Sequence, residues 1–142
     1  MEWKLELVAV PVWDVDAAKT FYADKVGFVV DHDHRVSEEI RFVQLTPPGS
    51  ACSIALGTGI SDARPGSVRG LQLVVADITA AHAHLVERGV EVTEVQDFPW
   101  GRFVFFPTPT ATAGPCSRSC GAEAQRLSWA AACSSTSARR CR

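Results

Sequence analysis

A strand–helix–strand pattern occurs twice in this chain, once in residues 8–30 and again in residues 72–92. The aspartate that opens each helix sets the period, which is 77 − 14 = 63 residues. A repeat of this length indicates a duplicated supersecondary unit and excludes a short-repeat solenoid. The positions that align are Asp14 with Asp77, Ala17-Ala18 with Ala80-Ala81, and, after a one-residue slip, Gly27 with Gly89.

Local signals explain why the first copy takes this form. Apolar residues alternate with other residues before the helix, which is the two-residue period of a strand. Asp14 stands where its carboxylate can accept from the free amides of a first helical turn. Gly27 stands where a residue with positive φ would end the helix. We therefore expect a helix over about residues 15–25.

Turn residues divide the rest of the chain into further strands. In the first unit, strands are predicted at residues 3–10, 28–34, 40–45 and 52–56. In the second unit, a helix is predicted at residues 78–87 and strands at 71–75, 90–95 and 102–106. The predicted fold class is α+β, with a βαβββ module at 1–57, a linker at 58–70, an incomplete second module at 71–106 and an atypical tail at 107–142.

Composition narrows the functional classes. Of the 142 residues 46% are hydrophobic and 21% charged, which is typical of a folded soluble domain. No apolar run approaches the roughly 20 residues that span a bilayer, and the first residues lack the pattern of a signal peptide. We expect a cytoplasmic protein with no membrane partner. A net charge of −2 gives no reason to expect nucleic acid.

The tail is a different kind of sequence. Residues 1–106 carry 9 Lys+Arg and 15 Asp+Glu, or −6, whereas residues 107–142 carry 5 Arg and 1 Glu, or +4. The repeat requires an eighth strand within about ten residues of Phe106, and none is recognisable there. At most, residues 122–133 could form one helix, and the remaining Pro, Ser and Gly favour disorder.

Each unit carries a recognisable motif. Its residues are Val12-Trp13-Asp14, Ala18, Phe21-Tyr22 and Gly27-Phe28 in the first unit, and Val75-Ala76-Asp77-Ile78 in the second. These motifs resemble those of the vicinal oxygen chelate superfamily, which includes glyoxalase I, bleomycin resistance proteins and extradiol dioxygenases. The resemblance covers roughly residues 4–106 and implies the glyoxalase/bleomycin resistance fold, in which two βαβββ modules form a cupped mixed sheet.

The same resemblance suggests an origin for the tail. Family members end on a strand with the pattern F-x-D-P-D-G-N-x-W-x-L, whereas this chain has Phe106-Pro107 followed by an unrelated run. Codons exist for residues 108–116 that, after insertion of one base, encode Asp-Pro-Asp-Gly-Asn-Gly-Trp-Ala-Leu. We interpret residues 108–142 as out-of-frame translation, so that the last strand is lost or replaced. The alternative is a lineage-specific tail.

The resemblance also identifies where a divalent metal would be held. In glyoxalase I-like members the ligands are His and Glu on four strands. The positions that match the first three are Leu7, Gln44 and Leu71 in this chain, and the fourth lies on the missing strand. Leucine cannot coordinate a metal and a neutral amide is a poor substitute for a carboxylate. We therefore expect no metal cofactor.

Other chemistry-bearing residues give weaker signals. His32 and His34 share one face of a strand, with Asp31 and Asp33 on the other, which suits either a two-histidine metal site or a solvated strand end. His82 and His84 are two apart on a helix and point in different directions. Cys52 is interpreted as a small core residue. Cys116 and Cys120 have a tolerable zinc spacing but no matched second pair.

What remains is an apolar cup with aromatic residues and one amide, a lining that suits an organic ligand. Its candidate ligand-binding residues are Leu7, Phe42, Gln44, Leu71, Trp100 and Phe103. The alternative is that the apolar members of this set are ordinary core.

Two functions follow from the resemblance. The first is a metal-free binding protein of the bleomycin resistance type, which holds a small organic molecule. The second is a metal-dependent lyase or dioxygenase of the glyoxalase class, which would need metal ligands such as His32 and His34. A third reading is an inactive product of a mutated gene. Family members commonly form homodimers, so a homodimer is expected.

Overall fold

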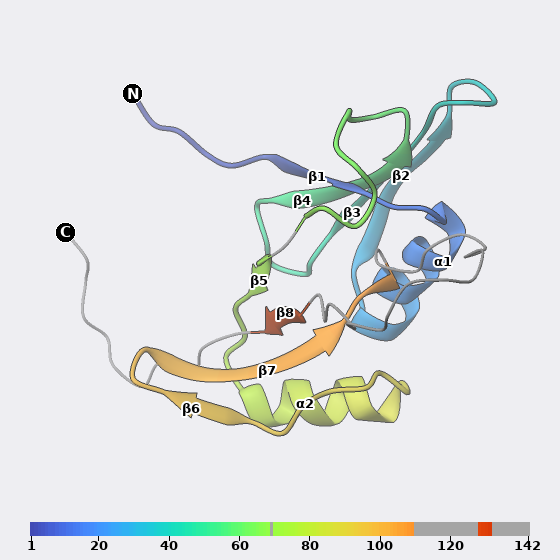
Figure 1. Ribbon diagram of the computed structural model, residues 1–142. Helices are drawn as coiled ribbons and strands as arrows, with labels where there is room; N and C mark the ends of the chain where they lie inside the picture. Colours follow the sequence, from blue (N-terminus) through green and yellow to red (C-terminus); the bar gives the residue numbers. More distant parts are fainter. Residues whose placement is uncertain (69, 110–127, 132–142) are drawn as a thin grey trace. The chain divides into compact units, whose positions relative to one another are not determined.

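The computed structural model describes residues 1–68, 70–109 and 128–131 of this chain (Figure 1). They divide into two units: residues 1–68 with 108–109, and residues 70–107 with 128–131. Each unit contains one copy of the repeat, so the duplication read from the sequence corresponds to two structural modules. Among the described residues, no helix is long and apolar enough to cross a membrane.

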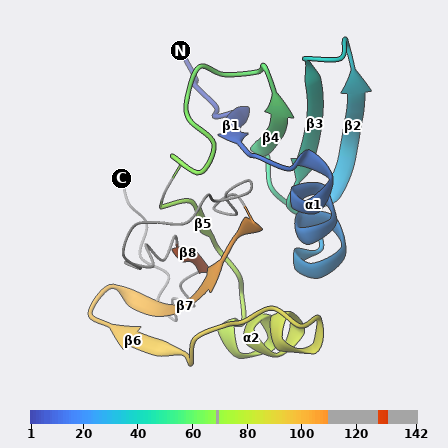
Figure 2. The ribbon, with the colours of Figure 1, turned by 45° about the vertical axis from the view of Figure 1, so that its right-hand side comes forward.

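The first unit is a four-stranded mixed sheet with one helical segment packed against it (Figure 2). The strand order is β1-β4-β3-β2, in which β1 and β4 run parallel and the other neighbours are antiparallel. Its elements are β1 (Leu7–Pro11), α1 (Val15–Thr20), η1 (Phe21–Val26), β2 (Val29–Arg35), β3 (Arg41–Thr46) and β4 (Ser53–Thr58).

The capping residues of the first helix act as the sequence predicts. The Asp14 side chain accepts a hydrogen bond from the amide of Ala17 at 2.9 Å. Gly27 ends the segment with a φ of 96°, in the left-handed region that glycine tolerates best. The helical segment is not uniform, because α1 gives way to the π-helical turn η1. There the amide of Gly27 bonds to the carbonyl of Tyr22, five residues back, at 3.0 Å.

The core of the first unit lies between the sheet and α1. Val43 and Leu45 of β3 are completely buried, as is Ala18 of α1. Val10 of β1 and Leu56 of β4 are at most 1% exposed. Burial of these apolar side chains is the main force that holds α1 on one face of the sheet.

The second unit repeats the architecture of the first. Its order is β5-β8-β7-β6, with β5 and β8 parallel, which is the first–fourth–third–second order again. Its elements are β5 (Gln72–Leu73), α2 (Ile78–Glu87), β6 (Gln96–Phe98), β7 (Gly101–Pro107) and β8 (Ser128–Ala131). Asp77 caps α2 by accepting from the amides of Thr79 and Ala80 at 2.9 and 3.1 Å. The helix has the bounds expected from the sequence.

Three expectations for the second unit need correction. The strand expected at 90–95 does not form, and β6 follows it at Gln96–Phe98. Thr93 nevertheless lies beside β7, since its amide bonds to the carbonyl of Phe105 at 2.9 Å. An eighth strand does exist, because β8 lies between β5 and β7. Its residues Ser128–Ala131 fall inside the stretch 122–133 for which a helix was considered.

The remaining differences concern the ends of strands. The predicted strand 3–10 begins only at Leu7, and the predicted strand 71–75 is reduced to Gln72–Leu73. Strand ends depend on partner strands, which local sequence does not specify. The β5–β8 pairing covers two residue pairs, Gln72 with Ala130 and Leu73 with Ala131.

Candidate functional site

The first sheet has two chemically different faces, set by the alternation of side chains along each strand. Val43 and Leu45 point toward α1, so Phe42, Gln44 and Thr46 must point the other way. We call this second side the Gln44 face. Cross-strand partners share a face, so the strand register gives its other members, which are Leu7, Ala9 and Pro11 of β1, Ser53, Ala55 and Gly57 of β4, and Val29, His32 and His34 of β2.

Three of the six predicted binding residues are therefore on one face. Leu7, Phe42 and Gln44 all belong to the Gln44 face of the first sheet. Leu7 is 37% exposed, and Phe42 and Gln44 are half-buried. Gln44 pairs with Ala55, which in turn pairs with Ala9. Two small side chains thus lie between the amide and the β1 edge of the sheet, Ala55 buried and Ala9 exposed.

A chain of side-chain hydrogen bonds crosses the Gln44 face. The Nε2 atom of Gln44 donates to Ser53 Oγ at 3.2 Å. Ser53 Oγ lies 2.6 Å from Thr46 Oγ1. Thr46 Oγ1 in turn donates to a carboxylate oxygen of Asp31. Ser53 is only 5% exposed, so this polar chain is partly shielded from water.

A β-bulge explains why Asp31 joins this chain. Simple alternation along β2 predicts Asp31 and Asp33 on the face opposite His32 and His34. The register of β2 against β3 shifts between Val30 and His32, which inserts one extra residue. A bulge of this kind brings adjacent side chains to the same side of a strand. Asp31 is therefore on the Gln44 face, and the sequence-based expectation for it was wrong.

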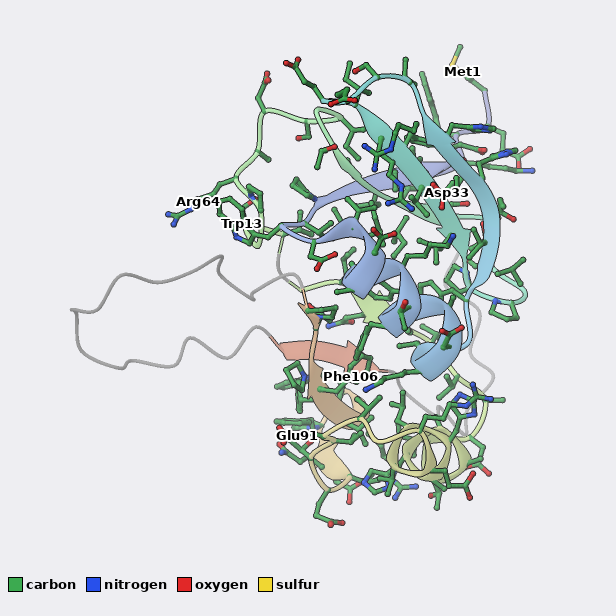
Figure 3. The ribbon with its side chains drawn as sticks, turned by 90° about the vertical axis from the view of Figure 1, so that its right-hand side faces the viewer. Met1, Trp13, Asp33, Arg64, Glu91 and Phe106 are labelled. Atoms are coloured by element: carbon green, nitrogen blue, oxygen red, sulfur yellow. The ribbon has the colours of Figure 1, made fainter. Side chains whose placement is uncertain are left out.

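Asp33 is on the opposite face, as the sequence predicts. It accepts from Arg41 Nε at 3.0 Å and Nη2 at 2.9 Å, and from Lys19 Nζ at 2.7 Å. Arg41 also donates to Asp16 of α1 at 2.8 Å. These bonds from Arg41 and Lys19 hold the pKa of Asp33 well below its usual range. Figure 3 labels Asp33 close to α1, so the network ties β2 and β3 to the helix.

The other three predicted residues belong to the second unit. Leu71 directly precedes β5, Trp100 is in the turn between β6 and β7, and Phe103 is on β7. Trp100 is 71% exposed and Phe103 is 8% exposed.

Phe103 is part of an aromatic cluster that the sequence analysis recognised only in part. Phe98 stacks on Trp100 with ring centroids 5.5 Å apart, and its ring meets Phe103 edge-on at 5.5 Å. Phe105 stacks on Phe103 at 6.3 Å. The spacing of Phe103 and Phe105 by two residues on one strand was the signal that could have revealed the cluster. We call Phe98, Trp100, Phe103 and Phe105 the aromatic cluster.

The six predicted residues thus divide equally between the two units. Leu7, Phe42 and Gln44 are brought together by the first sheet, whereas Trp100 and Phe103 are brought together in the second unit. That all six line a single cup stays a prediction.

No group of three or more His, Cys, Asp or Glu side chains gathers to hold a metal ion within residues 1–68, 70–109 and 128–131. His32 and His34 stack on each other, with ring centroids 5.6 Å apart. Cys52 is a free, half-buried thiol. Cys116 and Cys120 lie outside the described residues.

Comparison with known proteins decides the family. The sequence profile of the Glyoxalase/Bleomycin resistance protein/Dioxygenase superfamily matches residues 4–115. The chain belongs to this superfamily. The membership agrees with the resemblance in its motifs and with its two βαβββ modules.

Two solved structures and one further bacterial protein are similar to this chain. TnmS3, an antibiotic-binding protein from Streptomyces sp. CB03234, is 38% identical, with a TM-score of 0.69 over 77% of this chain and 89% of that one. A superfamily member from Sphaerobacter thermophilus is 31% identical, with a TM-score of 0.66 over 77% of this chain and 91% of its own. The uncharacterized protein YetH of Bacillus subtilis is 28% identical over 101 residues, 70% of this chain and 84% of YetH.

Proposed function

We propose that this glyoxalase-superfamily protein binds a small organic molecule and holds no metal ion in doing so. The observation that carries the proposal is the chemistry of the Gln44 face. The amide of Gln44 lies between an apolar side, formed by Leu7, Phe42 and two alanines, and a polar side, formed by His32 and the chain from Ser53 to Asp31. Sites for organic ligands commonly combine an apolar lining with a few such polar groups. The similarity to an antibiotic-binding protein at 38% identity supports the same class of ligand.

The aromatic cluster supports the proposal independently. Trp100 offers an exposed indole whose position is set by stacking on Phe98. A rigid aromatic surface loses little conformational entropy when a flat apolar molecule stacks on it. We therefore propose that Trp100 and Phe103 contact the ligand, together with Leu7, Phe42, Gln44 and Leu71.

The absence of a metal is proposed from the ligand positions themselves. The superfamily positions that hold His or Glu in metal-dependent members correspond to Leu7, Gln44 and Leu71 here. Two of these side chains have no donor atom. The competing proposal is a metal-dependent lyase or dioxygenase, and the observation in its favour is the stacked pair of His32 and His34.

One pair of measurements tests this proposal. Metal content by mass spectrometry, after incubation with Zn²⁺, Ni²⁺, Mn²⁺ and Fe²⁺, is expected to show less than stoichiometric metal. Titration with aromatic antibiotics is expected to quench tryptophan fluorescence and to raise Tm. Trp100→Ala should weaken this binding by about tenfold or more, since stacked aromatic contacts contribute roughly 0.5–1.5 kcal/mol beyond their buried area.

Trp13→Ala is the matched control, since Trp13 is also exposed, at 51%, and lies before α1 (Figure 3). Its affinity for the same antibiotics should stay unchanged. One tightly bound ion per chain would instead favour the enzyme proposal.

We further propose that the protein is a homodimer and lies in the cytoplasm. Sedimentation of the purified protein would test the dimer, and fractionation of cells would test the location.

A further inference from the structure

We infer that Gln44 presents its side-chain carbonyl oxygen to the ligand, so that the ligand carries an N–H or O–H donor on an otherwise apolar body. The inference rests on the proposed function and specifies its ligand class. It follows from the directions of three consecutive hydrogen bonds on the Gln44 face.

The direction of the chain is set at its acidic end. An ionised carboxylate can only accept hydrogen bonds, so Asp31 must receive the proton of Thr46. A threonine hydroxyl has one proton, and this bond uses it. The oxygen of Thr46 is then available only as an acceptor toward Ser53.

The second step concerns the hydrogen bond between Ser53 and Thr46. Ser53 Oγ is 2.6 Å from Thr46 Oγ1, and one of the two hydroxyls must donate. Since the Thr46 proton is already used, Ser53 is the donor. The Ser53 oxygen then has lone pairs but no proton for Gln44, and its 5% exposure leaves little room for water as a substitute partner.

The third step fixes the amide of Gln44. With Nε2 toward Ser53 the amide donates at 3.2 Å, whereas a flipped amide would place two acceptor oxygens against each other. The carbonyl oxygen Oε1 therefore points away from Ser53. No hydrogen bond to Oε1 is formed by the described part of the chain, and the atom is not among the buried ones that lack a partner. We expect water to satisfy this atom until a ligand covers it.

The neighbours of Gln44 determine which group can donate to Oε1 once a ligand covers the amide. Its cross-strand partners are Ala55 on β4 and His32 on β2, and Phe42 is two residues away on the same face. Ala55 and Phe42 have no donor, and His32, whose ring stacks on His34, forms no hydrogen bond to Oε1. A bound molecule that covers the amide must therefore supply the donor itself, because a buried acceptor without a partner loses the free energy of its bond to water. A site built to receive a donor discriminates against the analogue that lacks it.

The test compares naphthol with its methyl ether, two probes that differ by one hydroxyl proton. Both are titrated into ¹⁵N-labelled full-length protein and followed by chemical shift changes. The wild type should prefer naphthol by about tenfold, the worth of one hydrogen bond of about 1.4 kcal/mol. Gln44→Leu, which replaces the amide with an apolar group of similar size, should bind both probes equally. Ser53→Ala, which frees the amide to turn, should reduce the preference as well.

Phe42→Leu is the matched control, since it alters apolar contact without touching the hydrogen-bond chain. Phe42→Leu should lower the affinity for both probes by the same factor and leave the ratio of the two affinities unchanged. Equal affinity of the two probes for the wild type would overturn the inference while leaving the proposed function standing. Binding of neither probe, nor of any other aromatic compound, would contradict the proposed function instead.

NMR spectra of the protein without ligand test the orientation of the Gln44 amide separately. The Gln44 side-chain amide should give one downfield, exchange-protected proton, because one N–H is bonded to Ser53. That resonance should move to ordinary values in Ser53→Ala. If the Gln44 amide resonances are the same in the wild type and in Ser53→Ala, then Nε2 does not donate to Ser53, and the inference fails whichever ligands bind.

Discussion

Arg41 holds Asp33 with two guanidinium nitrogens, Nε at 3.0 Å and Nη2 at 2.9 Å, across neighbouring strands β3 and β2. Lys19 of the helix α1 adds a third donor at 2.7 Å. Arg41 and Asp33 therefore form a bidentate ion pair that is partly shielded from water, since the Arg41 side chain is 13% exposed. Together with Lys19, this ion pair links α1 to the sheet in addition to the apolar packing between them.

Replacing Asp33 tests the stability that this contact provides. Asp33→Asn removes the charge and should lower the free energy of unfolding by about 1–2 kcal/mol, because charge-assisted hydrogen bonds are stronger than neutral ones. The free energy is measured by urea unfolding at pH 7. Asp97→Asn is the control: Asp97 makes one contact to Arg102 at 3.0 Å and is 77% exposed. It should cost less than about 0.5 kcal/mol, and equal losses in the two variants would contradict the argument.

The same carboxylate gives the protein an acid-sensitive contribution to stability. Arg41 and Lys19 lower the pKa of Asp33 in the folded chain, whereas in the unfolded chain it titrates near 3.9. The unfolded state therefore binds the proton more readily, and the contribution from Asp33 is present above about pH 4 and lost as the pH falls below it. Urea midpoints between pH 6 and pH 2 should fall more steeply for the wild type than for Asp33→Asn. Parallel curves would mean that Asp33 does not contribute.

Gly57 of β4 is expected to tolerate no side chain. A Cβ atom there would lie 2.1 Å from the carbonyl oxygen of Arg41 and 2.9 Å from a methyl group of Ile60. The first of these is backbone in the neighbouring strand and cannot move aside alone. Gly57→Ala should destabilise the protein by about 1–3 kcal/mol, as overpacked sites do, which a thermal melt would detect.

Gly49 provides the comparison for that substitution. It has a φ of 80°, and nothing lies within 4 Å of a Cβ built on it. Gly49→Asn should be nearly neutral, because asparagine tolerates this backbone conformation better than other residues with side chains. If Gly57→Ala melts at the wild-type temperature, the backbone of β4 is able to move away from β3.

The tail leads to a prediction about the gene. Within the described residues, which on β8 are 128–131, β8 pairs with β5 over two residue pairs, whereas β4, its counterpart, pairs with β1 over five. A chain with the reading frame restored after Phe106 should place a longer strand here and melt at a higher temperature. The comparison is a pair of thermal melts of the two full chains. Equal melting temperatures would count against the frameshift, and so would a gene sequence that encodes the family ending in no frame.

The sequence alone determined the features whose causes are local. Asp14 and Asp77 act as helix caps because a short carboxylate beside the first turn needs no tertiary contact to find free amides. Gly27 ends its helix because glycine adopts positive φ without steric cost, and this preference does not depend on tertiary contacts. The duplicated pattern and the superfamily follow from the same local signals, repeated at one spacing.

Only the tertiary structure decided the features that depend on a neighbouring strand. The bulge that moves Asp31 onto the Gln44 face comes from the register between β2 and β3, and alternation along β2 alone gave the opposite side. The orientation of the Gln44 amide depends on Ser53 and Thr46, which meet it only across the sheet. Pairing in β-sheets links residues far apart in sequence, so the register and the hydrogen bonds across it could not be predicted from either strand alone.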